Sequence, residues 1–412
     1  MVSRAVLAAI AAGTLWFSGC AQTGAGRPAP GPAAAATHGH GPAQEPPADA
    51  RALVDQAFAV ACSMPGGPHA RPRARTQEDA ALAAIELGLE ARAVEMAREI
   101  VDWRRAEVYA RAAQRAARDG RREQAIALAE RARAGIPQES HWSRERVALE
   151  AAVAFALAGD RARADELVPL VVESERARVR AALVPGLPAE ALEAEADLFD
   201  RAIATRDLDM VRSAIEGWTA LLRRWASDDA LRARADQALD GAVAGLPVDL
   251  RIDANLSLAR TYRELGRADD AARRLDEAVR TFASAELLPE DEAPVGAAVA
   301  RARIAAGDAA GAETELRRLR QRFDARRGEI LSTRLARSLR ALGEAWAAAG
   351  DAAMARESFR DALDAGLVNP NGRPRAEDLV ATCIAMATSG TVPDPLTAQR
   401  IEAVRAQLGE PW

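Results

Sequence analysis

The sequence predicts an all-α protein, an α-solenoid built from successive helix–turn–helix repeats. Two observations carry this prediction. Alanine, the strongest helix former, supplies 102 of the 412 residues, and no long run of alternating β-branched residues interrupts the chain. Glycines also recur along the sequence, and small or apolar residues follow them at steps of four and three. Those steps place the residues on one helical face.

The composition favours a globular helical array and excludes several classes of function. Hydrophobic residues make up 49% of the chain but aromatic residues only 4%, so small helix faces can approach closely in an extended stack. All 55 positive side chains are arginine, and the absence of lysine excludes P-loop, protein-kinase and Schiff-base sites. A net charge of -5 with interspersed arginines also argues against nucleic-acid binding.

The N-terminus has the features of a targeting sequence. Arg4 precedes an apolar stretch, Ala5–Phe17, whose length fits the core of a signal peptide. The following Phe17-Ser18-Gly19-Cys20 resembles the lipobox of bacterial lipoproteins. This resemblance implies that residues 1–19 are removed and that Cys20 is lipidated and anchors the chain to a membrane. Ala21, rather than Asp, is compatible with the periplasmic side of the outer membrane. An ordinary secretory signal or a short membrane anchor is the alternative.

Residues 20–48 are expected to be the lipidated cysteine and a disordered tether, because this Pro/Gly/Ala-rich stretch lacks apolar periodicity. His38 and His40 fall within it and are most simply solvated. Cys62 and Cys383 lie near opposite ends of the remaining chain. We expect an elongated array to hold them far apart, so both should be free thiols.

The repeat is marked by its glycines. Gly350 is followed by Ala355, Phe359 and Ala362, and preceded by Gly343 and Trp346. The same frame recurs after Gly88, Gly120, Gly159, Gly266 and Gly307. Glycine suits the end of the first helix, and Asp160, Asp308 and Asp351 should cap the second. The pattern resembles the tetratricopeptide repeat, a helix–turn–helix unit of about 34 residues, and it is clearest over residues 106–139, 252–285 and 336–369. The resemblance implies a right-handed solenoid.

We divide the folded region into two arrays of tetratricopeptide-like repeats. Residues 49–226 form the N-terminal array and residues 227–412 the C-terminal array. The pattern fits least well from 177 to 250, where residues 189–205 and 208–226 should pair as helices. One further helix at 228–244 would then shift the alternation and could act as a hinge. Residues 374–389 and 394–408 should form two helices that cap the last apolar face.

The sequence contains no recognisable catalytic constellation. His69 and His141 belong to no metal-binding or nucleophile motif, and the carboxylates fall beside arginines on charged helix faces. We therefore expect no enzyme activity, no metal and no small-molecule cofactor.

Protein binding is the class of function that remains. The resemblance implies that the first helix of each unit lines a concave groove for peptide segments. The expected groove residues are Arg260, Arg263, Arg301, Arg337, Arg340 and Glu344, and their arginines could bind carboxylates of an acidic partner protein. The sequence thus predicts a membrane-anchored cell-envelope lipoprotein that acts as an interaction scaffold. The alternatives are a self-associating structural solenoid and a glycan- or peptide-processing enzyme.

Overall fold

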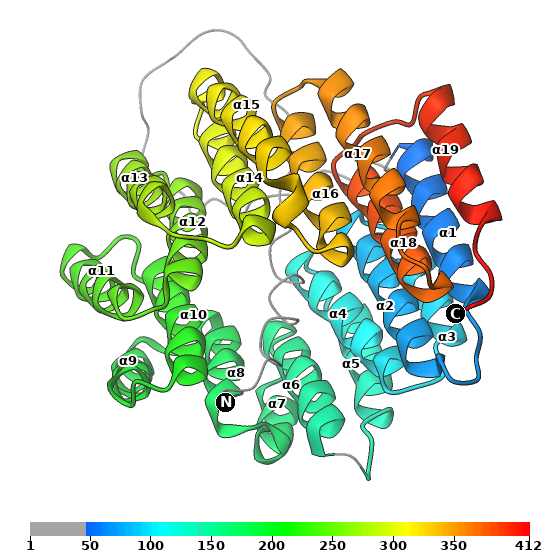
Figure 1. Ribbon diagram of the computed structural model, residues 1–412. Coiled ribbons are helices and arrows are strands. Elements are labelled where there is room, and N and C mark those ends of the chain that lie inside the picture. Colours follow the sequence, from blue (N-terminus) through cyan, green and yellow to red (C-terminus); the bar gives the residue numbers. More distant parts are fainter. Residues whose placement is uncertain (1–46, 140) are drawn as a thin grey trace, which may run out of the picture.

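The chain folds into a ring of helices in two concentric layers (Figure 1). A computed structural model describes residues 47–139 and 141–412, which form nineteen α-helices and no strand. Helices alternate along the chain between the inner and the outer layer, and most pack against their neighbours in sequence, whereas α8 packs against the inner helices α6 and α10. This confirms the predicted all-α solenoid.

Short connections join the two layers, so consecutive helices run antiparallel. The inner layer consists of α2 (Ala70–Glu86), α4 (Arg104–Arg118), α6 (His141–Leu157), α8 (Arg176–Leu183), α10 (Leu208–Arg224), α12 (Val248–Glu264), α14 (Pro289–Ala305), α16 (Ser332–Ala348) and α18 (Gly372–Thr388). The outer layer consists of α1 (Ala48–Ser63), α3 (Glu90–Glu99), α5 (Arg122–Ala134), α7 (Arg161–Leu167), α9 (Ala189–Ala204), α11 (Asp229–Ala244), α13 (Ala268–Ser284), α15 (Ala309–Arg326), α17 (Ala352–Leu367) and α19 (Pro395–Ala406).

The turns from inner to outer helices have the predicted chemistry. The six glycines of the repeat frame all adopt positive φ, between 73° and 94°, which only glycine adopts without strain. Gly390 after α18 does the same with φ 69°, and the sequence analysis had not included it. The side chains of Asp160, Asp308 and Asp351 accept hydrogen bonds from backbone N–H groups of the next helix, as expected for N-caps.

Small residues allow the helices of a unit to approach closely. A Cβ atom on Gly343 of α16 would lie 2.9 Å from the Phe359 ring of α17, so any larger residue would force the pair apart. Ala125, Ala164 and Ala355, at equivalent positions of the frame, are fully buried. Ala271, at the same position of its unit, is only half-buried. Helix packing through alanine therefore recurs around most of the ring.

The two ends of the folded chain meet and close the ring. Helix α18 packs along α1 and also contacts α2, so α1 occupies the position that the outer helix of a unit holds elsewhere (Figure 1). One hydrophobic core runs through this junction and includes Leu53 of α1 together with Leu379 of α18. Gln56 Nε2 donates to Glu402 Oε1 of α19 at 2.8 Å, across the same junction. The closing unit is thus made from both ends of the sequence.

Ring closure corrects two expectations. The array is not elongated, because Cys62 lies on α1 and Cys383 on α18, the two helices that pack together. Both thiols are nevertheless free, as predicted. The helix expected at 374–389 exists as α18, but it is not a cap. Its apolar face is covered by α1, whereas a cap ends the stack with a polar surface.

The middle of the chain forms a second hydrophobic core. Trp218 of α10 and Tyr262 of α12 belong to this cluster, which is separate from the core that runs through the junction. The boundary expected between the N-terminal and the C-terminal array, at residues 226 and 227, falls inside this second core. The expectation that the helix at 228–244 shifts the alternation is wrong, because α8, absent from the sequence analysis, restores the pairing of inner and outer helices.

The signal peptide, Cys20 and all but the last two residues of the tether lie outside the described residues. Within 47–139 and 141–412, no helix has both the length and the apolar character needed to cross a bilayer.

Candidate interaction surface on the inner helices

The inner helices place corresponding residues side by side around the ring. Arg260, Arg301 and Glu344 each stand six residues before the turn glycine of their helix, at 266 - 260, 307 - 301 and 350 - 344. They therefore occupy the same register on α12, α14 and α16. The faces of the inner helices turned to the ring centre are called the inner surface below, and this register lies on it.

Charges from distant parts of the sequence influence one another on the inner surface. Burial and then the charge of Glu344 on α16 raise the pKa of Glu86 on α2 to about 7, against the opposing effect of Arg111 on α4. Burial also raises the pKa of Glu344, against the effect of Arg301 and Arg340. Burial makes an isolated charge unfavourable here, so carboxylates and arginines on this surface need partners of opposite charge.

Contacts between arginines and carboxyl groups join the inner helices in sequence around the ring, as ion pairs except at Glu78, whose raised pKa favours the neutral form. The pairs and their N···O distances are Arg104–Glu78 between α2 and α4 (3.2 Å), Arg111–Glu150 between α4 and α6 (3.1 Å), Arg178–Glu150 between α6 and α8 (3.6 Å), Arg178–Glu216 between α8 and α10 (3.2 Å), Arg223–Glu264 between α10 and α12 (3.1 Å), Arg301–Glu344 between α14 and α16 (2.5 Å), Arg340–Asp378 between α16 and α18 (2.9 Å) and Arg75–Glu377 between α18 and α2 (3.3 Å). The last pair lies at the ring closure. Among the described residues, no ion pair joins α12 to α14.

The structure divides the expected groove residues into two groups. Arg301 and Glu344 bind each other, Arg340 binds Asp378, and Arg337 of α16 lies 3.5 Å from Asp291 of α14. Their charges are used within the protein, to hold inner helices together. Arg260 and Arg263 of α12, by contrast, make no ion pair within the described part of the chain. Sequence position alone could not separate these groups, since it does not show which acid faces each arginine.

The seam between α12 and α14 carries like charges. Arg260 is half-buried, and burial lowers its pKa, with Arg263 and Arg301 lowering it further and Glu264 opposing them. Glu264 is itself bound by Arg223. Between α14 and α16, Arg301 forms an ion pair with Glu344. Between α12 and α14, the residue in the same register as Glu344 is another arginine, and Arg260 and Arg301 repel each other. A carboxylate at this seam would relieve the repulsion and could accept two parallel hydrogen bonds from a guanidinium group.

A buried carboxyl pair joins α2 to α4. Glu78 is 5% exposed and Glu107 is fully buried. Arg146 of α6 donates two hydrogen bonds to Glu107, at 2.7 and 2.8 Å, and Arg104 lies 3.2 Å from Glu78 Oε2. The buried Glu78 Oε1 has no other hydrogen-bond partner, so it can bond to Glu107 only when one of the two carboxyl groups carries a proton. Burial and the nearby Glu107 accordingly raise the pKa of Glu78 far above its ordinary 4.5.

The pair holds helices together and is shielded from substrates, because neither carboxyl group reaches solvent appreciably. The pairing of Glu78 with Glu107 was not expected from the sequence. The available signal was that Glu78 and Glu107 interrupt faces otherwise made of alanine, such as Ala74 and Ala81 around Glu78 and Ala110 after Glu107. In the described residues, no group of three or more His, Cys, Asp or Glu side chains could hold a metal ion.

We predict that Glu78→Gln stabilises the protein at alkaline pH. The raised pKa means that the folded state holds a proton which the unfolded chain releases above about pH 4.5. Wild-type stability should therefore fall as pH rises toward the folded-state pKa. Glutamine keeps the hydrogen bond to Glu107 without titrating, so urea unfolding at pH 8 should show a gain of about 1–3 kcal/mol that vanishes near pH 4.5.

Glu99→Gln, at an exposed position of α3, is the matched control and should not change the pH profile. Parallel pH profiles for the wild type and Glu78→Gln would contradict the shared proton.

Comparisons with known proteins give no family for the chain. No protein-family model matches it, and no curated protein matches it. A solved structure described as "Crystal structure of Ton1535 from Thermococcus onnurineus NA1" is 13% identical, with 87% of this chain and 97% of that chain covered and a TM-score of 0.25. A second, "Circular tandem repeat protein with novel repeat topology and enhanced subunit contact surfaces", is 14% identical, with 87% and 96% covered and a TM-score of 0.26. At these TM-scores neither likeness bears on fold or function.

Proposed function

We propose that the protein is a membrane-anchored cell-envelope lipoprotein whose ring binds acidic segments of partner proteins on its inner surface. One observation carries the binding part of this proposal. Contacts between arginines and carboxyl groups join all the remaining pairs of neighbouring inner helices in the described chain. At the α12–α14 seam, by contrast, Arg260 and Arg263 of α12 make no ion pair with a carboxylate of α14. A partner carboxylate would complete the series.

The energetics favour an acidic ligand at this seam. A half-buried guanidinium without a partner has lost part of its hydration and gained no ion pair. Hydrogen bonds to charged groups contribute about 1.5–3 kcal/mol each, more than neutral ones. Because Arg301 is already bound by Glu344, we assign the main contacts to Arg260 and Arg263. This narrows the binding site from the six groove residues expected from the sequence to two.

The anchoring part of the proposal is supported by the N-terminal sequence. Ala5–Phe17 fits the core of a signal peptide, and Phe17-Ser18-Gly19-Cys20 resembles a lipobox. A lipid on Cys20 would hold the ring at a membrane, on the periplasmic side of the outer membrane, and raise its effective concentration near envelope partners. The tetratricopeptide-like repeat pattern agrees with a scaffold role, since solenoids of this kind present extended binding surfaces.

We predict that replacing Arg260 and Arg263 together by Glu weakens binding of a Glu/Asp-rich synthetic peptide by about tenfold or more, because each tenfold corresponds to about 1.4 kcal/mol. Fluorescence anisotropy at low and at physiological salt measures this, and wild-type affinity should fall as salt rises.

The matched control replaces Arg98 and Arg318 by Glu. Both are exposed arginines on outer helices that make no ion pair within the described residues, and the change in net charge is the same. Equal losses in the two double variants would show a general charge effect and overturn the assigned site. Self-association of the wild-type chain that the peptide does not compete with would favour the structural alternative.

We predict that Cys20→Ser releases the protein from the membrane fraction and abolishes incorporation of a labelled fatty acid, because the thiol is the expected attachment point of the lipid. Cell fractionation and metabolic labelling measure both effects. Cys62→Ser is the control and should leave both unchanged. A labelled or membrane-bound Cys20→Ser protein would show that the lipobox interpretation is wrong.

A further inference from the structure

One edge of the ring carries a circle of exposed apolar side chains. Because consecutive helices are antiparallel, the N-terminal ends of all inner helices lie on the same edge. At or just before these ends, eight large apolar residues are 36–76% exposed: Val101, Trp142, Val172, Leu208, Val248, Leu288, Leu331 and Val368. They mark eight successive inner helices, α4 to α18. This edge is called the apolar rim below.

The opposite edge has a different character. It carries the turns from inner to outer helices, in which Gly120, Gly159 and Gly350 are flanked by Asp119, Asp160 and Asp351. We call it the glycine rim. Leu170, 36% exposed, lies in the connection that leads to α8. Of the other exposed large apolar residues in the described chain, only Val392, before α19, and Leu396, in the first turn of α19, lie away from the apolar rim. A distribution confined so closely to one edge exceeds the scattered exposure expected of an ordinary surface.

Unpaired acidic residues stand beside the apolar side chains over α8, α12 and α14. Glu173 follows Val172, Asp249 follows Val248, and Glu290 lies two residues after Leu288. None of the three acidic side chains makes an ion pair within the described residues. Burial and then the charge of Asp249 raise the pKa of Asp253, one turn after Asp249, to about 6, against the opposing effect of Arg212. Negative charge is therefore in excess at the start of α12.

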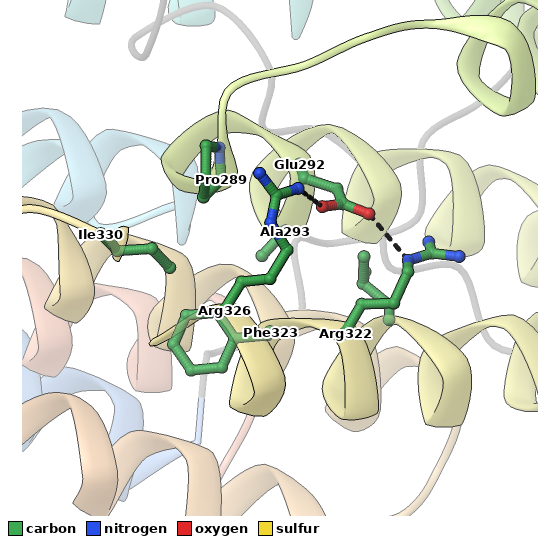
Figure 2. A pocket seen from close by; sticks show the side chains of 8 residues that line it. Pro289, Glu292, Ala293, Arg322, Phe323, Arg326 and Ile330 are labelled. Atoms are coloured by element: carbon green, nitrogen blue, oxygen red, sulfur yellow. Dashed lines mark hydrogen bonds and ion pairs between the residues drawn. The ribbon is translucent and has the colours of Figure 1, made fainter. Parts of the chain in front are cut away.

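An apolar depression adjoins Leu288 and Leu331. Pro289, Ala293, Phe323 and Ile330 line it, with Leu319 beneath, and the ion pairs of Glu292 with Arg322 (2.7 Å) and Arg326 (3.2 Å) border it (Figure 2). It has no room for a water-sized probe. The depression is thus closely packed by its own side chains and is not a cavity, so the apolar contacts that the rim offers are those of its exposed residues.

The acidic residues of the apolar rim and the position of the N-terminal end of α1 indicate what binds to this rim. A second ring stacked on this rim would bring Glu173, Asp249 and Glu290 near their own copies, which like charge disfavours. The tether enters at the N-terminal end of α1, which lies at the glycine rim because α1 is antiparallel to α2. In the proposed lipoprotein, the anchor therefore joins the ring at the glycine rim, the edge opposite the apolar rim.

We propose that the apolar rim over α8, α10, α12 and α14 docks a partner protein through a segment that combines apolar and basic side chains. The apolar side chains of the segment pack against Val172, Val248 and Leu288, and its basic side chains bind the adjoining acids. This surface is distinct from the Arg260 seam on the inner surface, which selects acidic segments. The separation of the membrane anchor from the apolar rim rests on the proposed anchoring, whereas the binding chemistry of the rim does not.

The test uses the full chain and a synthetic amphipathic helical peptide of Leu and Lys. We expect Val248→Ser with Leu288→Ser to weaken peptide binding by about tenfold or more, because a few apolar residues at the centre of an interface supply most of its binding free energy. Asp249→Asn with Glu290→Gln should weaken binding less and reduce its salt dependence. Leu396→Ser, at a site 59% exposed away from the rim, is the control and should bind as the wild type does.

Three results would overturn the proposal. The first is equal affinity of the Val248/Leu288 variant and the Leu396 control. The second is concentration-dependent self-association of the wild-type chain, seen by sedimentation, that the Val248/Leu288 variant loses. The third is binding of the wild-type chain to zwitterionic lipid vesicles that the same variant loses. The Arg260/Arg263 variant should retain peptide binding, so failure here is distinguishable from failure of the acidic-segment site.

Discussion

The packing of α18 against α1 is the contact on which the architecture depends. An open solenoid leaves an unpaired apolar face at each end, which a polar cap must cover. Here the last inner helix and the first outer helix cover each other, and one core runs through the junction. The ends of the sequence therefore stabilise each other, and the loss of either helix would expose the apolar face of the other.

Closure also determines the electrostatics of the inner surface. It brings α2 and α16 near enough for the charge of Glu344 to raise the pKa of Glu86, while burial raises the pKa of Glu344 itself. Most inner arginines bind carboxylates on the adjacent inner helix, which explains why an arginine-rich surface is largely neutralised. Arg260 and Arg263 are informative because they are exceptions. The apolar rim is a consequence of the same geometry, since it gathers the starts of parallel inner helices on one edge.

The sequence predicted local structure better than long-range contacts. The turn glycines and the Asp caps follow from spacing within one unit, and both are found. Closure was missed because it depends on the curvature accumulated over many units, to which no single motif corresponds. The short helix α8 was missed because it spans only eight residues and lies where the repeat pattern fits least well. The pairing of Arg301 with Glu344, 43 residues apart, likewise requires the register between neighbouring units.

Crosslinking across the junction tests ring closure most directly. Gln56→Cys with Glu402→Cys, in a chain with Cys20→Ser and Cys62→Ser, places thiols where the wild-type side chains share a hydrogen bond. The remaining Cys383 is buried, and burial raises the pKa of its thiol to about 12, so it stays unreactive. A short bismaleimide should join α1 to α19 within monomers, independent of protein concentration, as mass spectrometry of the peptides would show. Only intermolecular crosslinks, or none, would contradict the closed ring.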